Sequence, residues 1–264
     1  MISSLHSSPA ALIVGHPGHE LRLFHWLETA RPVVFVLTDG SGSGSARVEA
    51  TRRILSATGS SAGSVMGDFA DHEMYRAVLE RDVTRVAEAT LRIAEELAAR
   101  NVTAVVADMF EFYNPTHDLC AVVANLAAAH ASAMTRRTIA RYDFAVIGTP
   151  PGDGEVLELD DAAVERKVAA AAAIEELKPE VDHLLDRIGI DALRREVLRP
   201  LATSNELPRP TAKPFYETHG EERVAAGRYS TVLRYDQHFA PFVERLVAEV
   251  GLATSRSGLH AYRS

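Results

Sequence analysis

The chain has 264 residues, of which 47% are hydrophobic and 24% charged, and its formal net charge is -8. These values are ordinary for a globular enzyme, and the lack of a strong basic run argues against nucleic acid as the main partner. The single cysteine, Cys120, excludes an internal disulfide and a cysteine zinc cluster, and it fits a reducing, cytoplasmic location. No apolar stretch approaches the roughly 20 residues of a membrane span. Residues 1–10 are polar and typical of a flexible tail rather than a secretory signal.

The first predicted element is a short buried strand at 11–14, which is followed by a polar turn and a helical pattern. A second β-rich run at 33–37 ends in Thr-Asp-Gly. Strand, helix and strand at this spacing predict a βαβ unit with parallel strands. A Ser-Gly loop at 41–45 comes next, and a helix is predicted over 47–58, ended by Gly59.

The next segment is predicted as a loop over 59–69, with a short strand near Val65 as an alternative, followed by one long or two joined helices over 71–100. A third strand at 103–107 leads to a turn and another helix, and a fourth strand is expected at 144–147. This alternation predicts an α/β fold, a Rossmann-like open and mostly parallel sheet flanked by helices, in residues 11–150.

The pattern changes in residues 151–264, which are expected to complete the same domain as a helical and irregular C-terminal extension. Irregular structure is expected at 200–230, where four prolines occur. The predicted helices lie at 160–188 with a bend at Pro179, at 191–199 and at 242–250.

Three histidines stand just after predicted strands: His16 and His19 after the first, and His117 after the third. The carboxyl ends of parallel strands meet at one edge, where open α/β sheets bind their ligands. Imidazole is a common zinc ligand, and three ligands with a fourth position for water are typical of catalytic zinc. The sequence therefore predicts a site for Zn²⁺, or another divalent metal. The alternative is three unrelated histidines.

The same stretches resemble the PIG-L or LmbE-like family of zinc-dependent deacetylases, which remove acetyl groups from N-acetylglucosamine-type sugars. The resemblance covers roughly residues 11–150 and implies a Rossmann-like fold. The similar segments are GHPGHE at 15–20 for the family's AHPDDE, TDG at 38–40, RVEA at 47–50 for the family's RxxE, and NPTH at 114–117 for HPDH.

Carried over residue by residue, the resemblance implies metal ligands at His16, His19 and His117, with His19 in place of an aspartate. It also implies that Arg47 contacts substrate, although a surface salt bridge is an alternative. The family's general base falls on Gly18, and a histidine that stabilises its transition state falls on Asn114. The metal set is thus retained in altered form, while two catalytic groups are missing.

Nearby residues could replace the missing groups, and each has a structural alternative. The candidate carboxylates are Glu20, Asp39, Glu111 and Asp118. As structural alternatives, Glu20 could favour the helix dipole, Asp39 could orient a ligand imidazole, and Asp118 could cap its helix. Tyr113 or Asn114 could donate to a developing oxyanion, or be an ordinary loop residue. An acid from the C-terminal third, His219 or His238, is a further alternative.

The leading hypothesis is a zinc-dependent hydrolase that removes an N-acyl group, acetyl in the family, from an amino sugar or similar polar small molecule. Hydroxide on a three-imidazole zinc would attack the carbonyl, and the more positive centre would lower the pKa of bound water. The first alternative is an esterase or other altered chemistry in the same fold. The second is a non-catalytic ligand-binding or partner subunit, motivated by Gly18. A small-molecule substrate is expected, with no nucleic acid or membrane partner, and homo-oligomerisation stays open.

Overall fold

The computed structural model describes residues 9–148, 154–178, 193–202 and 207–260, together with residues 182, 186 and 189. Most of the expected flexible tail and the expected bend at Pro179 lie outside these ranges. No helix in the described part of the chain is long and apolar enough to cross a membrane.

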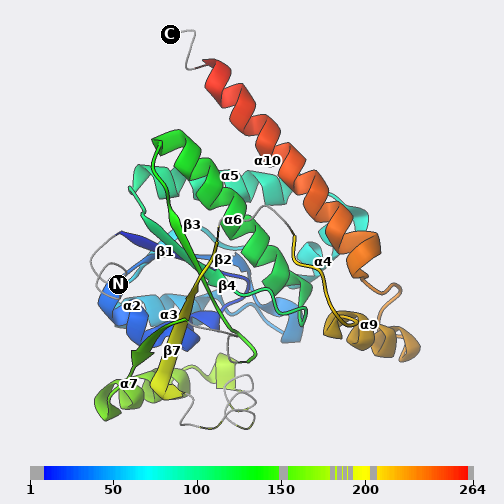
Figure 1. The fold of residues 1–264 in the computed structure, drawn as a ribbon. Coiled ribbons are helices and arrows are strands. Elements are labelled where there is room, and N and C mark those ends of the chain that lie inside the picture. The colour runs from blue at the N-terminus through cyan, green and yellow to red at the C-terminus, as the bar shows by residue number, and fades with distance from the viewer. Residues whose placement is uncertain are drawn as a thin grey trace.

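A mixed seven-stranded sheet forms the centre of the molecule, in the order β3-β2-β1-β4-β5-β7-β6 (Figure 1). The first five strands in this order are parallel to their neighbours, whereas β7 is antiparallel to both β5 and β6. The fold is therefore α/β with an open, mostly parallel sheet, as expected. The strands are β1 (Ala10–Val14), β2 (Val33–Thr38), β3 (Ser61–Phe69), β4 (Ala104–Asp108), β5 (Ala140–Phe144), β6 (Glu155–Glu158) and β7 (Arg195–Pro200).

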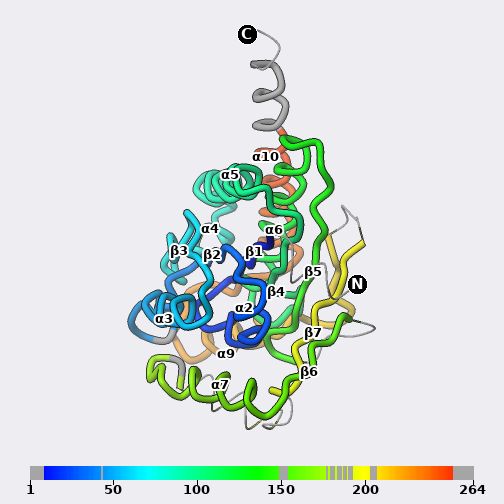
Figure 2. The backbone as a smooth tube through the Cα atoms, turned by 90° about the vertical axis from the view of Figure 1, so that its left-hand side faces the viewer, coloured from blue at the N-terminus to red at the C-terminus, as the bar shows by residue number. Residues whose placement is uncertain are grey.

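Helices cover both faces of the sheet (Figure 2), and each face has its own apolar cluster. Along β1, Ala11 and Ile13 face the cluster of α4, α5, α6 and α10, while Leu12 and Val14 face that of α2, α3 and α7. The helices are α2 (Phe24–Ala30), α3 (Val48–Thr58), α4 (Asp71–Glu80), α5 (Thr84–Ala99), α6 (Pro115–Thr135), α7 (Asp161–Ala172), α9 (Phe215–Ala225) and α10 (Ala240–His260). Shorter helical turns are η1 (His19–Leu23), η2 (Ser41–Ser43), η3 (Glu175–Leu177) and η5 (Tyr235–Phe239).

Several predicted elements are wrong, mainly where strand pairing overrides the local pattern. Strand β3 replaces most of the loop expected at 59–69 and extends well beyond the short strand considered near Val65, because it pairs with the neighbouring β2 despite two register shifts. Strand β7 replaces the helix expected at 191–199, because Glu196 and Leu198 alternate inward while its backbone pairs with two strands. Strand β5 lies earlier than expected, and Phe144 is its last residue.

The C-terminal part also differs from its predicted structure. Helix α9 occupies part of the segment expected to be irregular, and Pro214 immediately precedes it, a position where proline is tolerated. Helix α7 is shorter than the predicted pattern at 160–188. The segment 151–264 also contributes two strands, β6 and β7, to the sheet, in addition to its helices and loops.

Candidate metal centre

The rings of His16, His19 and His117 lie together at the carboxyl end of the parallel strands. Their centroids are 5.3 Å apart for His16 and His19, 5.2 Å for His16 and His117, and 4.5 Å for His19 and His117. Each pair meets edge to face, with interplanar angles between 68° and 82°. Segments separated by about a hundred residues therefore supply one compact cluster of imidazoles.

Strand order explains why these turns meet. Strand β1 lies between β2 and β4, with Val14 paired to Val36 and Ile13 paired to Ala107. His16 follows β1, and His117 lies in the first turn of α6 after β4. His19 begins η1 directly after Gly18, which has a φ of 106°. Because this backbone conformation favours glycine, the position has a structural reason to carry no side chain.

Hydrogen bonds fix the ring of His16 and indicate its tautomer. Its Nδ1 lies 2.7 Å from the Thr38 hydroxyl, which itself donates to the Gly15 carbonyl at 3.0 Å. The hydroxyl hydrogen is thus engaged, so the ring donates from Nδ1 to Thr38, and Nε2 keeps a lone pair. A carboxylate oxygen of Asp71 lies 3.1 Å from the same Nδ1. The Nε2 atom is buried and has no hydrogen-bond partner among the described residues.

Of the two remaining rings, His117 is buried and His19 is partly exposed. His19 Nδ1 lies 2.8 Å from Oδ2 of Asp108, which also accepts the Gly15 N–H at 2.8 Å. His117 Nδ1 is buried and has no partner in the described part of the chain. A buried nitrogen without a partner is costly, so its environment favours a ligand that satisfies it.

Burial and neighbouring charges lower the pKa of two of the three histidines. Burial, followed by the charges of His16 and Arg47, lowers the pKa of His19 well below its usual value. Burial, followed by the charges of the other two histidines, lowers the pKa of His117 in the same way. Neutral imidazole is the form that binds metal. Burial would raise the pKa of Asp71, but the hydrogen bond and charge of His16 outweigh it and lower that pKa.

The three imidazoles are of the type that binds divalent cations, and hydrogen bonds orient two of them. The side chains do not, however, form a complete set of metal ligands in their present positions. Among the described residues, no group of three or more His, Cys, Asp or Glu side chains is arranged to hold a metal ion as it stands. Metal binding would therefore require side chains of the cluster to move from these positions.

Two of the carboxylates proposed from the sequence have structural partners. Glu20 is fully buried; it accepts the Thr51 hydroxyl at 2.6 Å and the Gly18 N–H at 2.8 Å, and so supports the turn. Burial raises its pKa. Asp39 accepts the N–H of Ser41 at 2.9 Å and so shapes the loop after β2. The carboxylates that lie against the imidazoles are instead those of Asp71 and Asp108.

The residues before α6 are also engaged in local structure. Asn114 caps the helix by accepting the Thr116 N–H at 2.8 Å. Asp118 accepts the N–H groups of Glu111 and Phe112 at 3.0 and 3.1 Å, so it holds the preceding loop rather than capping its helix with that oxygen. Burial raises the pKa of Asp118 to about 7.

Glu111 and Tyr113 lie on the same loop. Glu111 accepts the N–H groups of residues 146–148, at 3.1 to 3.3 Å. The ring of Tyr113 lies 6.5 Å from that of His117, so it is next to the cluster. Among the sequence candidates, Tyr113 is thus an aromatic neighbour of the three histidines.

Arg47 approaches the cluster from the start of α3. Its charge contributes to the lowered pKa of His19, and its side chain packs against Gly40, where an added Cβ would lie 2.9 Å from its Nε. Its backbone N–H donates to the Asp39 carbonyl at 2.7 Å. The structure therefore places this guanidinium near the histidines.

Sequence reasoning did not identify Asp71 and Asp108. Asp108 is the last residue of β4. A charged residue at the end of an apolar strand is the sequence signal that could have identified it. Asp71 begins α4 and accepts the Gly42 N–H at 2.5 Å, which ties the Ser-Gly loop to His16. Its role depends on β3, a segment whose sequence pattern predicts a loop.

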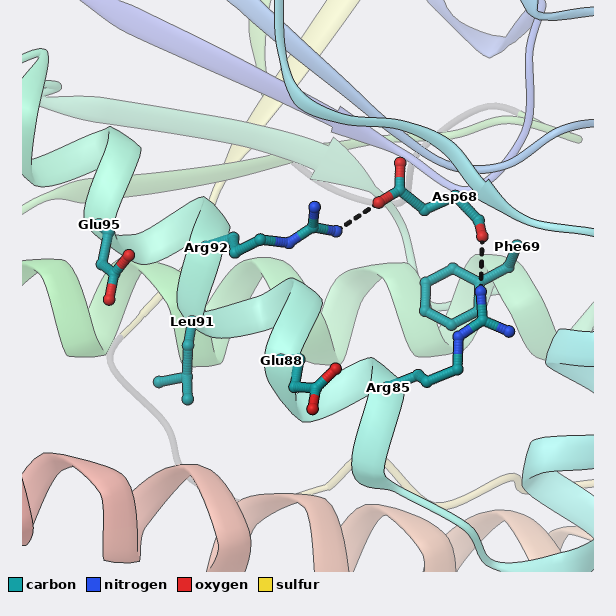
Figure 3. A pocket seen from close by; sticks show the side chains of 7 residues that line it. All are labelled: Asp68, Phe69, Arg85, Glu88, Leu91, Arg92 and Glu95. Carbon is teal, nitrogen blue, oxygen red and sulfur yellow. Dashed lines mark hydrogen bonds and ion pairs between the residues drawn. The ribbon is translucent and has the colours of Figure 1, made fainter.

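A hollow of about 540 Å³ lies elsewhere, between the end of β3 and α5 (Figure 3). Its two arginines are already paired: Arg92 with Asp68, and Arg85 with Glu73 and the Asp68 carbonyl. None of the three clustered histidines lines it. Its chemistry therefore does not compete with the histidine cluster as a candidate centre. The residues that line it are Asp68, Phe69, Arg85, Glu88, Leu91, Arg92 and Glu95.

Comparison with known proteins supports the fold. The zinc-inhibited form of teicoplanin deacetylase Orf2 superposes with a TM-score of 0.52 at 13% sequence identity, covering 75% of this chain and 100% of that chain. The fold of this chain is thus similar to that of a deacetylase. No family model matches the sequence, and no curated protein matches it.

Two other structures align less well. A conserved protein from Thermus thermophilus gives a TM-score of 0.48 at 17% identity over 78% of this chain and 99% of that chain. The A40926 pseudoaglycone deacetylase Dbv21 gives 0.44 at 17% identity over 75% and 99%.

Proposed function

We propose that the protein is a metal-dependent hydrolase that removes an N-acyl group, acetyl in the first instance, from an amino sugar or a similar polar small molecule. The observation that carries the proposal is the buried, unpartnered Nε2 of His16, with its lone pair fixed by the hydrogen bonds on Nδ1, beside two further neutral imidazoles. The fold shared with a deacetylase is consistent with this chemistry.

In this proposal His16, His19 and His117 hold the ion, and zinc is the expected metal because three imidazoles suit it. When bound, such an ion acts as a Lewis acid on a carbonyl and lowers the pKa of a water ligand. Asp71 and Asp108 keep two rings oriented, since each carboxylate lies against an Nδ1 atom and leaves Nε2 for the ion. Arg47 supplies positive charge at the edge of the cluster, where a polar substrate would bind.

Metal content and deacetylation should be measured together on the full chain. We expect one zinc ion per chain after loading, a higher unfolding temperature, and release of acetate from one or more N-acetyl sugars in a panel. At 100 times the dissociation constant, the ion should add about 2.7 kcal/mol to the free energy of unfolding.

The variant His117→Ala should lose the ion, the thermal shift and the activity together, because it removes one of three ligands. His72→Ala is the matched control, since this exposed histidine lies next to Asp71 on α4. If His117→Ala retained stoichiometric zinc, the three-histidine assignment would be wrong. Loss of zinc with retained hydrolysis would instead overturn the role of the metal.

Ester hydrolysis is a second candidate, and the hydrogen bonding of the carboxylates favours it. Glu20, Asp39 and Glu111 are each engaged with backbone or hydroxyl donors, so none is poised to protonate a departing amine. An alcohol leaves with less help from a general acid than an amine does. Turnover of matched O-acetyl and N-acetyl analogues of one sugar distinguishes the two: faster amide cleavage would exclude the esterase.

A further inference from the structure

The turn that follows β5 holds a carboxylate with its backbone N–H groups. Val146, Ile147 and Gly148 all donate to the Glu111 carboxylate, at distances of 3.1 to 3.3 Å. Oε1 accepts from Ile147 and Gly148, while Oε2 accepts from Val146 and Ile147. Successive backbone N–H groups that converge on one acceptor form a nest, a concave arrangement that binds anions. We name residues 146–148 the N–H nest.

The N–H nest does not depend on the bound carboxylate for its shape. On its other side, Arg22 Nε donates to the Ala145 carbonyl at 3.2 Å, and Arg22 Nη2 donates to the Gly148 carbonyl at 3.0 Å. Strand β5 ends at Phe144, whose carbonyl accepts the Met109 N–H at 2.9 Å. The turn is thus held through its carbonyl groups, so its N–H groups should stay in place when the carboxylate leaves.

The N–H nest lies at the same edge of the sheet as the histidine cluster. Phe144 pairs with Asp108 between β5 and β4, and the Asp108 carboxylate bonds to the ring of His19. The charge of Arg22, which holds the nest, also contributes to the lowered pKa of His19. The nest is therefore adjacent to the cluster, within the range over which the charge of Arg22 acts on this ring.

The N–H nest is open enough for its occupant to exchange. Val146 is buried, but Ile147, Gly148 and Glu111 are only half-buried. A Cβ added at Gly148 would meet no atom within 4 Å in the described part of the chain, so there is room beside the nest. Burial raises the pKa of Glu111, and the charge of Asp108 adds to this effect, so an ionised Glu111 would gain from hydration outside the nest. A second carboxylate would keep the three N–H groups satisfied.

We propose that the N–H nest is a carboxylate subsite, and that Glu111 fills it until the carboxylate of the substrate takes its place. The assignment rests on the proposed function, in which the N-acyl group of the same molecule lies at the histidines. It specifies the substrate as an N-acyl compound that also carries a carboxylate, because two oxygens of one planar group meet the three N–H donors. A neutral N-acyl compound would leave Glu111 in the nest and lack this contact.

The first test is whether the vacated nest binds a free carboxylate. The probe is formate, added to the full chain at constant ionic strength with chloride as the reference anion. Formate should raise the unfolding temperature of Glu111→Ala more than that of the wild type, in which the nest is filled. Glu88→Ala, on the exposed face of α5, is the matched control and should respond like the wild type. Equal responses of Glu111→Ala and the wild type would reject the nest as a carboxylate site.

The second test compares N-acetylmuramic acid, an N-acetyl sugar with a carboxylate, with its uncharged methyl ester by NMR titration of the full chain in the presence of zinc. Glu111→Ala should bind the acid about 10- to 100-fold more tightly than the ester, the factor expected for hydrogen bonds to a charged group. The wild type should show a smaller preference of the same sign, because Glu111 competes. Glu111→Gln, which keeps the side chain but removes its charge, should lie between the two and serves if Glu111→Ala does not fold.

Equal affinities for acid and ester in the wild type and in Glu111→Gln would overturn the subsite, as would undetectable binding of the acid to every protein. The same preference for the acid in all proteins would place the carboxylate elsewhere and overturn the role of Glu111. Acetate release from N-acetyl sugars with no preference for the acid would leave the proposed function standing and reject only the subsite. A preference that depends on Glu111, without any acetate release, would leave the subsite standing and reject the proposed function.

Discussion

Asp108 and His19 are joined by a 2.8 Å hydrogen bond between Oδ2 and Nδ1, although 89 positions separate them in the chain. The same oxygen accepts the Gly15 N–H, so one buried carboxylate links the end of β4 to the turn after β1. Burial raises the pKa of Asp108 to about 7, against the effects of the Gly15 N–H and of His16. The carboxylate therefore orients the ring and fixes the turn that carries it.

Substituting the two orienting carboxylates should weaken metal binding while leaving all three histidines in place. We expect Asp108→Asn and Asp71→Asn each to lower zinc affinity about 10- to 100-fold, because an amide is a weaker partner for the ring N–H. Competition with a chelator of known affinity provides the measurement. Asp39→Asn is the matched control, since Asp39 directly follows β2 at this edge but its carboxylate accepts the Ser41 N–H. Equal affinities in Asp39→Asn and Asp108→Asn would remove the orienting role.

Gly18 is expected to resist substitution because of its backbone conformation. Its φ of 106° lies in the region that side chains disfavour, so Gly18→Ala should cost about 1–2 kcal/mol in the free energy of unfolding. Gly18→Asp should cost at least as much, and it should not simply restore a general base. Urea unfolding measures both effects.

The control for this prediction is Gly251→Ala in α10, where an added Cβ meets nothing within 4 Å. Alanine in a helix should stabilise by about 0.5–1 kcal/mol relative to glycine, so the two alanine variants should change stability in opposite directions. A Gly18→Ala protein as stable as the wild type would show that the turn relaxes to accept a side chain. In that case the absence of the aspartate would have no structural reason.

The positions of the histidines were predictable because they depend on local signals. Apolar runs at 11–14 and 103–107 mark buried strands, and parallel strands place their following turns at one edge. Two short strand patterns therefore sufficed to bring residues 16 and 117 together. The same reasoning predicted the α/β class and most of the helices in the first half of the chain.

The orienting carboxylates and the stacking of Phe215 on Tyr113 could not be predicted in the same way. Asp71 reaches His16 because β3 pairs with β2, yet the sequence of β3 has exposed, small and polar residues that favour a loop. Phe215 reaches Tyr113 through α9, which follows a proline-rich segment. In both cases tertiary pairing, rather than local propensity, decides the position of the side chain.

Glu111 provides a prediction for the pH dependence of stability. Burial raises its pKa above the ordinary value of 4.5, so the folded protein holds this proton at pH values where the unfolded chain has lost it. The contribution of Glu111 to the free energy of unfolding should therefore fall as pH rises from 4.5 to its folded pKa. In Glu111→Gln this slope should disappear, although the loss of one acceptor for residues 146–148 should lower stability at every pH.

Urea unfolding of the wild type and Glu111→Gln at several pH values, from about 4 to about 8, measures this slope. Glu88→Gln, on the exposed face of α5, is the control and should follow the wild type. A difference between wild type and Glu111→Gln that stays constant with pH would contradict a raised pKa for this carboxyl. Hydrolysis retained in Glu111→Gln would also separate its structural role from catalysis.

The buried pair of Lys167 and Glu196 is expected to be among the most sensitive positions for stability. Their side chains are 4% and 0% exposed and 2.8 Å apart, and Glu196 also accepts the N–H groups of His25 and Trp26 at the start of α2. Lys167 donates to the Arg22 carbonyl at 2.8 Å. The pair thus ties α7, β7 and the first turns after β1 together.

Removing one member should leave the other as a buried charge, so Lys167→Met should cost about 3–5 kcal/mol in the free energy of unfolding. In Lys167→Met/Glu196→Gln the uncompensated charge is gone and the amide oxygen can still accept from α2, so the double variant should be more stable than Lys167→Met. Chemical denaturation of the wild type, both single variants and the double variant gives the coupling energy. The outcome against this explanation is a double variant whose loss of stability equals the sum of the losses in the two single variants. The cost of Lys167→Met would then come from lost packing and from the lost hydrogen bond to the Arg22 carbonyl, and not from the charge left on Glu196.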